Sequence, residues 1–136
     1  MIELSVNAAV MPTESPEKVA RAIEKLFDGI VLEGTDERIE GRGGIDALST
    51  FHRLLREERI LDTARAVILR GRVGEAFQFR LNKQAASAGR ISFPPEEEPL
   101  GSIHVEIRGP QLIVDWLAPQ TFDGRPIEEI DLEDHV

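Results

Sequence analysis

The clearest local pattern in this 136-residue chain is IHVEIRGPQLIVDW, at residues 103–116. Apolar side chains alternate with polar ones as far as Arg108 and again from Leu112, which is the period of a half-buried β-strand. If Gly109 and Pro110 are the central residues of a turn, every apolar residue before the turn faces an apolar residue after it. The stretch therefore predicts a β-hairpin with one apolar face.

Further stretches predict strands because apolar and polar side chains alternate in them. They are residues 2–10, 30–33, 37–40, 77–81 and the short segment 91–93. Gly34-Thr35-Asp36 is expected to form a turn between the second and the third. The glycine-rich segment 41–44 is expected to be a loop.

Helical spacing separates these strands. Ser15 and Pro16 are suited to begin a helix, and the apolar residues from Val19 to Phe27 follow at helical spacing. The same spacing recurs at 46–55 and at 61–68. Strands and helices therefore predict an α+β fold in a single domain.

Composition limits the classes of protein and of site. With 41% hydrophobic and 30% charged residues the chain is typical of a globular domain. It has no cysteine, so disulfides and cysteine-ligated zinc or iron–sulfur centres are excluded. No apolar run approaches the roughly 18 residues of a membrane span, and residues 1–6 lack the basic start of a signal peptide. We expect one cytoplasmic domain over residues 1–136, without a cofactor and with an acidic, loosely held tail from about residue 121.

The charge is unevenly distributed along the chain. The net charge of −9 argues against a general nucleic-acid binder, because phosphate is neutralised by Lys and Arg. Residues 38–90, however, carry eleven basic and six acidic side chains, whereas residues 91–136 carry two basic and eleven acidic ones. A basic face built from the middle of the chain is therefore compatible with the composition.

Several segments, in one order along nearly the whole chain, resemble an uncharacterised archaeal protein family. They are Pro12-Thr13-Glu14, Leu81-Asn82-Lys83-Gln84-Ala85-Ala86, Pro99-Leu100-Gly101-Ser102-Ile103, and Asp115-Trp116-Leu117-Ala118-Pro119 followed by Thr121 and Gly124. The resemblance implies a fold similar to the large-subunit ribosomal protein that carries 5S ribosomal RNA, with a curved antiparallel sheet packed against helices on one face. It implies no activity and no catalytic residues, and RNA binding follows from it only as an analogy between folds.

The first candidate site is a polar surface formed by Arg80, Lys83, Gln84 and Arg90. Arg80 alternates with buried strand residues, and Lys83 and Gln84 are expected in a loop where they could reach phosphate or a base edge. The alternative is that Asn82-Lys83-Gln84 caps a short helix and that Arg80 is a solvated strand residue. Inward-facing aromatics count against RNA binding, because readers of single-stranded RNA display aromatics.

A second candidate is the set of helical arginines around Arg53 and Arg56, which are three residues apart and share a helix face. They could line a track for phosphates. The alternative, which we favour, is a solvated helix face with Glu57, Glu58 and Asp62 as partners within the chain.

A third candidate is His104 with Asp115, which face each other in the expected hairpin. A carboxylate beside an imidazole can orient a general base, but no nucleophile accompanies the pair. An ordinary cross-strand surface pair explains them as well.

The remaining candidates have simpler structural explanations. The segment 41–44 lacks the lysine of a phosphate-binding loop, and the carboxylates of Glu96-Glu97-Glu98 point in different directions. His52 is expected to be a structural histidine, and His135 lies in the tail.

Two interpretations of function stay open. The first is a non-catalytic module that binds RNA or works with a ribosome-associated protein in translation or RNA processing. The second is a protein-interaction module without nucleic acid, either a homodimer or an acidic C-terminal part that meets a basic partner. An enzyme is less expected, because the sequence assembles no nucleophile, base and oxyanion donor.

Overall fold

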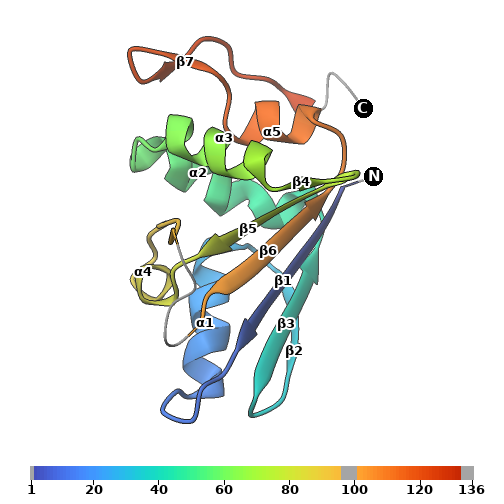
Figure 1. Ribbon diagram of the computed structural model, residues 1–136, viewed down its shortest axis with the longest axis vertical. Helices are drawn as coiled ribbons and strands as arrows, with labels where there is room; N and C mark the ends of the chain where they lie inside the picture. The colour runs from blue at the N-terminus through green and yellow to red at the C-terminus, as the bar shows by residue number, and fades with distance from the viewer. Residues whose placement is uncertain (1, 96–100, 133–136) are drawn as a thin grey trace.

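The structure is a computed structural model that describes residues 2–95 and 101–132. Its elements, in chain order, are β1 (Glu3–Ala9), α1 (Pro16–Leu26), β2 (Val31–Gly34), β3 (Arg38–Gly43), the short 3-10 helix η1 (Ile45–Leu48), α2 (Ser49–Glu57), α3 (Leu61–Arg70), β4 (Arg72–Val73), β5 (Ala76–Leu81), α4 (Lys83–Ser87), β6 (Ile103–Arg108), α5 (Leu112–Leu117), β7 (Thr121–Phe122) and β8 (Arg125–Pro126). The predicted α+β class is confirmed (Figure 1).

Six strands form one antiparallel sheet in the order β2-β3-β1-β6-β5-β4. The first strand of the chain lies in the middle, where β1 pairs with β3 on one side and with β6 on the other. A strand from the first ten residues and a strand from residues 103–108 therefore lie next to each other at the centre of the sheet. Residues from distant parts of the sequence come side by side there.

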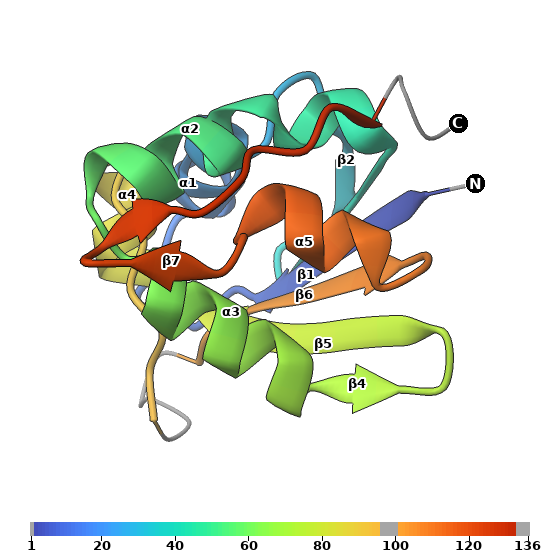
Figure 2. The same ribbon diagram turned by 90° about the horizontal axis from the view of Figure 1, so that it is seen from above.

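The helices cover one face of this sheet (Figures 1 and 2). Every second side chain of β1, β5 and β6 is buried against them, including Val6, Phe79 and Val105. Phe51 of α2 links the two layers, because its ring centroid lies 5.5 Å from that of Phe27 and 5.9 Å from that of Phe79. Full burial of such side chains stabilises the fold by about 1.5–3 kcal/mol each.

The expected hairpin at 103–116 is wrong in its second half. Residues Leu112–Leu117 form α5, and β6 pairs with β1 and β5 instead. The buried residues are Ile113, Val114, Leu117 and Ala118, a spacing that puts them on one side of a helix. The apparent alternation from Leu112 was therefore one part of a helical pattern, and burial against the helix layer decided the outcome.

The expected loop at 41–44 is largely strand, because β3 continues to Gly43. Gly41 pairs with Val6 of β1 and with Leu32 of β2. A Cβ atom on Gly41 would lie 2.7 Å from Cδ1 of Ile30 and 2.8 Å from Cδ2 of Leu32. The glycine thus makes room for two core side chains within a strand.

The helical region after η1 divides into α2 and α3 at Arg59, which has a positive φ of 57°.

The residues that follow α5 return over these helices (Figures 1 and 2). The small β7–β8 hairpin lies beside α3, where the hydroxyl of Thr121 donates a hydrogen bond to Asp62. Part of the tail, expected to be loosely held, is therefore in contact with the helix layer. Among the described residues no helix is long and apolar enough to cross a membrane.

Candidate nucleic-acid interface

The face of the sheet turned away from the helices displays polar side chains. Along β1, β5 and β6 every second residue is buried, so the residues between them point outward. We call this surface, formed by the outward residues of β1, β3, β5 and β6, the open face. At its centre the strand register gives a first row of Asn7, His104 and Arg80 and a second row of Ser5, Glu106 and Gln78.

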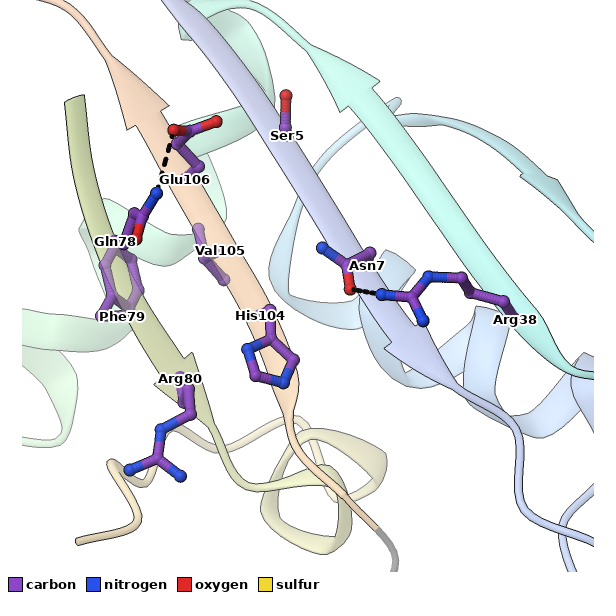
Figure 3. Close-up of a pocket in the computed structure, with 9 residues that line it drawn as sticks. All are labelled: Ser5, Asn7, Arg38, Gln78, Phe79, Arg80, His104, Val105 and Glu106. Atoms are coloured by element: carbon purple, nitrogen blue, oxygen red, sulfur yellow. Dashed lines mark hydrogen bonds between the residues drawn. The ribbon is translucent and has the colours of Figure 1, made fainter. Parts of the chain in front are cut away.

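A hollow of about 530 Å³ lies over these two rows (Figure 3). Arg38 of β3 borders it, and its Nη2 donates a 2.7 Å hydrogen bond to Oδ1 of Asn7. In the second row Nε2 of Gln78 donates to Oε1 of Glu106 at 3.3 Å. The hollow is in the size range of small-ligand sites, and its lining can both donate and accept hydrogen bonds.

The charge of the open face is mixed. Arg38 and Arg80 lie at opposite sides of the hollow (Figure 3). Glu106 adds a carboxylate farther along β6, two residues beyond His104. Nε of Arg38 lies 3.7 Å from Oε1 of Glu40, and Nη2 of Arg80 donates to the Pro95 carbonyl at 3.3 Å. Such a face suits recognition by hydrogen bonds with a few phosphate contacts, rather than a continuous track for phosphates.

Lys83 is buried, so the exposed loop position predicted for it is wrong. Its side chain is 7% exposed, and its Nζ donates to the Ala9 carbonyl at 2.6 Å and to Oε1 of Glu14 at 2.9 Å. A buried ammonium requires such partners, because leaving water without them is costly. Lys83 therefore ties α4 to the end of β1 and to Glu14, just before α1.

The alternative reading of the neighbouring residues is confirmed. The side chain of Asn82 accepts a 2.7 Å hydrogen bond from the Ala85 amide and thereby caps α4. Gln84 and Arg90 are exposed on this segment, but the lining of the hollow includes neither of them. The structure therefore places only Arg80 of the predicted set in the hollow, and RNA contacts of Gln84 and Arg90 stay predictions.

The arginines of α2 lie on the helix layer and have partners within the chain. The favoured alternative is confirmed for Arg53 with Glu57, whereas the acidic partner of Arg56 is Glu129 rather than an acid of the same helical region. Nη1 of Arg53 lies 2.8 Å from Oε1 of Glu57, one helical turn away. Arg56 donates to the carbonyls of His52, Trp116 and Leu117, and its Nη2 lies 2.6 Å from Oε1 of Glu129.

Comparison with known proteins identifies the family. A family model described as RNA binding matches residues 3–109, which include the whole six-stranded sheet. A UPF0201 protein of Methanosarcina acetivorans is 44% identical over 98% of this chain and 94% of its own length. The chain belongs to the UPF0201 family. The archaeal family expected from the sequence is thereby confirmed, whereas the likeness to the 5S RNA carrier stays a prediction.

Two further UPF0201 relatives add to this. The crystal structure of a UPF0201 protein from Methanococcus jannaschii has a TM-score of 0.83 and 32% identity, and the match covers 93% of this chain and 99% of that one. A protein of Archaeoglobus fulgidus named UPF0200/UPF0201 is 41% identical over 96% of this chain, but the match covers only 41% of its length. UPF0201 sequence thus also occurs as one part of a longer protein.

The predicted pairing of His104 with Asp115 is wrong, because Asp115 belongs to α5 on the helix layer. Its Oδ1 lies 2.9 Å from Nη1 of Arg65 in α3. His104 remains on β6, where Asn7 and Arg80 lie opposite it on the two neighbouring strands. The reason is the helical conformation of residues 112–117, which removes the expected hairpin.

The other candidates give no site within the part of the chain that the structure describes. His52 is half-buried and its ring stacks on Trp116 at a centroid distance of 4.4 Å, as a structural histidine would. Glu96-Glu97-Glu98 and His135 lie outside the described residues. Within residues 2–95 and 101–132 no group of three His, Asp or Glu side chains is placed to hold a metal ion.

Sequence reasoning missed Asn7, Arg38 and Gln78 as members of one surface. Each occupies a polar position of an alternating strand, so the sequence did indicate that their side chains point away from the core. It did not indicate which strands pair. The UPF0201 sheet places β1 between β3 and β6, and this order brings the three residues together.

Proposed function

We propose that this UPF0201 chain binds RNA through the open face of its sheet. The observation that carries the proposal is the hollow over the two rows, where amide, imidazole, guanidinium and carboxylate groups converge from three adjacent strands. The elements that build it lie within residues 3–109, the range matched by the RNA-binding family model.

The chemistry of the open face supports RNA as the ligand. Asn7 and Gln78 carry amides that can donate to and accept from base edges, and arginine can bind phosphate. Aromatic residues are the usual stacking surfaces for unpaired bases, but imidazole rings and guanidinium planes also serve. His104, with Arg80 opposite it in the first row, supplies both.

The helix layer supports the proposal less well. Arg53, Arg56 and Arg65 each lie within 3 Å of a carboxylate oxygen of Glu57, Glu129 or Asp115. Phosphate would have to compete with these ion pairs. The buried Lys83 would need to leave Glu14 before it could contact RNA.

The analogy with the ribosomal carrier of 5S RNA belongs to the same proposal. A sheet with one face covered by helices and one polar face offers a broad surface to structured RNA. We infer a cytoplasmic role with RNA or with a ribosome-associated protein. This role follows only from the likeness expected between the two folds.

Binding to a mixture of structured RNAs at about 50 and 200 mM salt tests the proposal, since phosphate contacts weaken steeply over this range. We expect the Arg80→Ala, His104→Ala double variant to bind at least about tenfold more weakly than the unmodified chain. Arg53→Ala on the helix layer is the matched control and should bind within about twofold of the unmodified chain. No binding at either salt, or equal losses in both variants, would contradict the proposal.

A second candidate function, protein interaction, is favoured by the Archaeoglobus relative. Its name joins UPF0200 and UPF0201, and the match with this chain leaves more than half of its length uncovered. When members of two families are joined in one chain, each part meets the other at a high effective concentration. We therefore infer a UPF0200 protein as a partner of this chain.

The β7–β8 hairpin is the surface best suited to such a partner. Phe122 is 75% exposed and Ile127 is 65% exposed, and both lie outside the range of the RNA-binding family model. Co-expression with the UPF0200 part of the Archaeoglobus protein tests this. The Phe122→Ser, Ile127→Ser double variant should lose co-purification and Val31→Ser, at an equally exposed valine of β2, should keep it. Absence of co-purification with the unmodified chain would exclude this partner.

A further inference from the structure

The second row of the hollow has a composition that phosphate binding does not explain. It consists of the hydroxyl of Ser5, the carboxylate of Glu106 and the amide of Gln78. A carboxylate at the centre of a surface repels phosphate. The first row, by contrast, places His104 beside Arg80 and has Arg38 bonded to its Asn7 end. The two rows therefore suit different parts of a nucleotide.

Strand geometry gives the dimensions of this arrangement. His104 and Glu106 are two residues apart on β6, which places them about 7 Å from each other along the strand. Neighbouring strands lie about 5 Å apart, so the three strands span about 10 Å across the hollow. The hollow of about 530 Å³ falls within the range of pockets that hold a small ligand. One nucleobase lying on the first row can reach the second row with its edge.

Glu106 is held in place but keeps capacity to accept hydrogen bonds. Nε2 of Gln78 donates to its Oε1 at 3.3 Å, and Nη2 of Arg108 lies 3.7 Å from the same oxygen. Its side chain is 34% exposed. Because an ionised carboxylate offers about four lone-pair sites, these two neighbours leave room for donors from a ligand.

The donor pattern of the bases selects among possible ligands. A carboxylate with two oxygens pairs best with two adjacent N–H groups. Guanine presents two, at N1 and N2 of its Watson–Crick edge, whereas the other three RNA bases present no such adjacent pair there. That edge is accessible to a protein only when the base is unpaired. A solvated cross-strand contact of Glu106 with Gln78 and Arg108 is the competing structural explanation.

We propose that the hollow binds one unpaired guanine of an RNA, with Glu106 accepting from N1 and N2 and the base stacked on His104. This inference rests on the proposed RNA-binding function and adds the identity of the base. Arg38 and Arg80, at opposite sides of the hollow, then contact the flanking phosphates (Figure 3). Glu106 is the residue that determines specificity, and the arginines supply affinity.

The test uses adenine nonamer RNAs that carry guanine, inosine, cytosine or uracil at the central position, and it measures the dissociation constant of each. We expect the guanine oligomer to bind at least about fivefold more tightly than the all-adenine one, which is the lower end for a bidentate base contact. The inosine oligomer should lie between them, because inosine lacks only the N2 amino group.

Glu106→Gln should remove the guanine preference while the affinity for the all-adenine oligomer stays the same or rises. Glu40→Gln, which changes an acid of the open face outside the hollow, should keep the preference. Equal affinities for all oligomers, or a preference that survives Glu106→Gln, would overturn the guanine assignment. If structured RNA binds through Arg80 and His104 but no oligomer does, the assignment falls and the proposed function stands. If no RNA binds at all, both fall.

Discussion

The open face and the helix layer both contain arginines, but they use them differently. On the helix layer Arg53, Arg56 and Arg65 have carboxylate oxygens at 2.8, 2.6 and 2.9 Å. On the open face the Arg38–Glu40 and Arg108–Glu106 pairs are separated by 3.7 Å. Arginine content alone therefore says little about where a nucleic acid binds, and the distances to neighbouring carboxylates say more.

The physical cause lies in the two kinds of element. Helical residues one turn apart, or on packed helices, can bring an arginine directly onto an acid. Strand neighbours two residues apart are about 7 Å from each other, so their side chains meet less closely. The comparison indicates a stabilising role for the helix-layer arginines. That Arg38 and Arg80 bind RNA stays a proposal.

The largest expected effect would come from Lys83, which the sequence placed with the binding residues and the structure places in the interior. Lys83→Met should lower the free energy of unfolding by about 3–5 kcal/mol, because it leaves the Glu14 carboxylate, whose side chain is only 14% exposed, without its cation. Urea denaturation measures this loss. The Lys83→Met, Glu14→Gln double variant should recover part of it, and a loss below about 1 kcal/mol would mean that Lys83 behaves as a surface residue.

A substitution of Arg56 tests whether the arginines of the helix layer stabilise the fold. Arg56→Met keeps the apolar stem but removes the bonds to three carbonyls and to Glu129, so we expect a loss of about 1.5–3 kcal/mol in the free energy of unfolding. Limited proteolysis should also cut the C-terminal residues faster, because Glu129 anchors them. An unchanged proteolysis pattern would show that Arg56 does not hold the tail.

The pH dependence of stability tests the same region with a smaller effect. Burial, together with the nearby positive charge of Arg56, lowers the pKa of His52 below its ordinary value of 6.5. The folded chain therefore binds this proton less readily than the unfolded chain, and stability should fall as the pH drops below about 6.5. His52→Phe keeps a ring against Trp116 and should flatten this dependence. Equal slopes for both proteins between about pH 5.5 and 7.5 would contradict the assignment.

A second, more acidic transition should belong to Glu129. The hydrogen bond from Arg56 is the main cause that lowers the pKa of this carboxyl below 4.5. The stabilisation that the ionised Glu129 gives to the folded state is present above about pH 4.5 and is lost as the pH falls through the lowered pKa. In Arg56→Met this part of the acid transition should be absent, which thermal unfolding at about pH 3 to 5 would detect.

Arg53 should give the smallest effect. Its partner Glu57 is one turn away on the same exposed helix face, and such pairs contribute about 0.3–0.5 kcal/mol. Urea denaturation of Arg53→Ala should therefore differ little from that of the unmodified chain. If Arg53→Ala lowered the free energy of unfolding as much as Arg56→Met, the exposed Arg53–Glu57 pair would stabilise the fold as much as the contacts that join Arg56 to the C-terminal residues.

The sequence predicted much of the local structure. Alternation at 2–10 and 77–81 and helical spacing at 16–27 correspond to β1, β5 and α1. Leu112–Leu117 was misread because Leu112, Val114 and Trp116 also fit a strand, and only packing against α2 and α3 separates the two readings. A local pattern predicts the conformation well where only one period fits the apolar residues, and poorly where the strand period and the helix period both fit.

The candidate site was harder to predict because it depends on contacts between distant residues. Lys83 is buried by partners 74 and 69 positions away, Ala9 and Glu14, and no local pattern indicates such partners. Arg80 was placed correctly on an outward strand position, since alternation alone determines that. Its neighbours Asn7 and Arg38 required the strand order, which tertiary packing sets.

The most direct test of the central claim is amide-resolved NMR of the labelled protein during titration with structured RNA. We expect the largest chemical-shift changes on the open face, at Asn7, Arg80, His104 and Glu106, with little change at Arg53 and Arg65. Changes concentrated on α2 and α3, with the open face unaffected, would contradict it and would place the RNA on the helix layer.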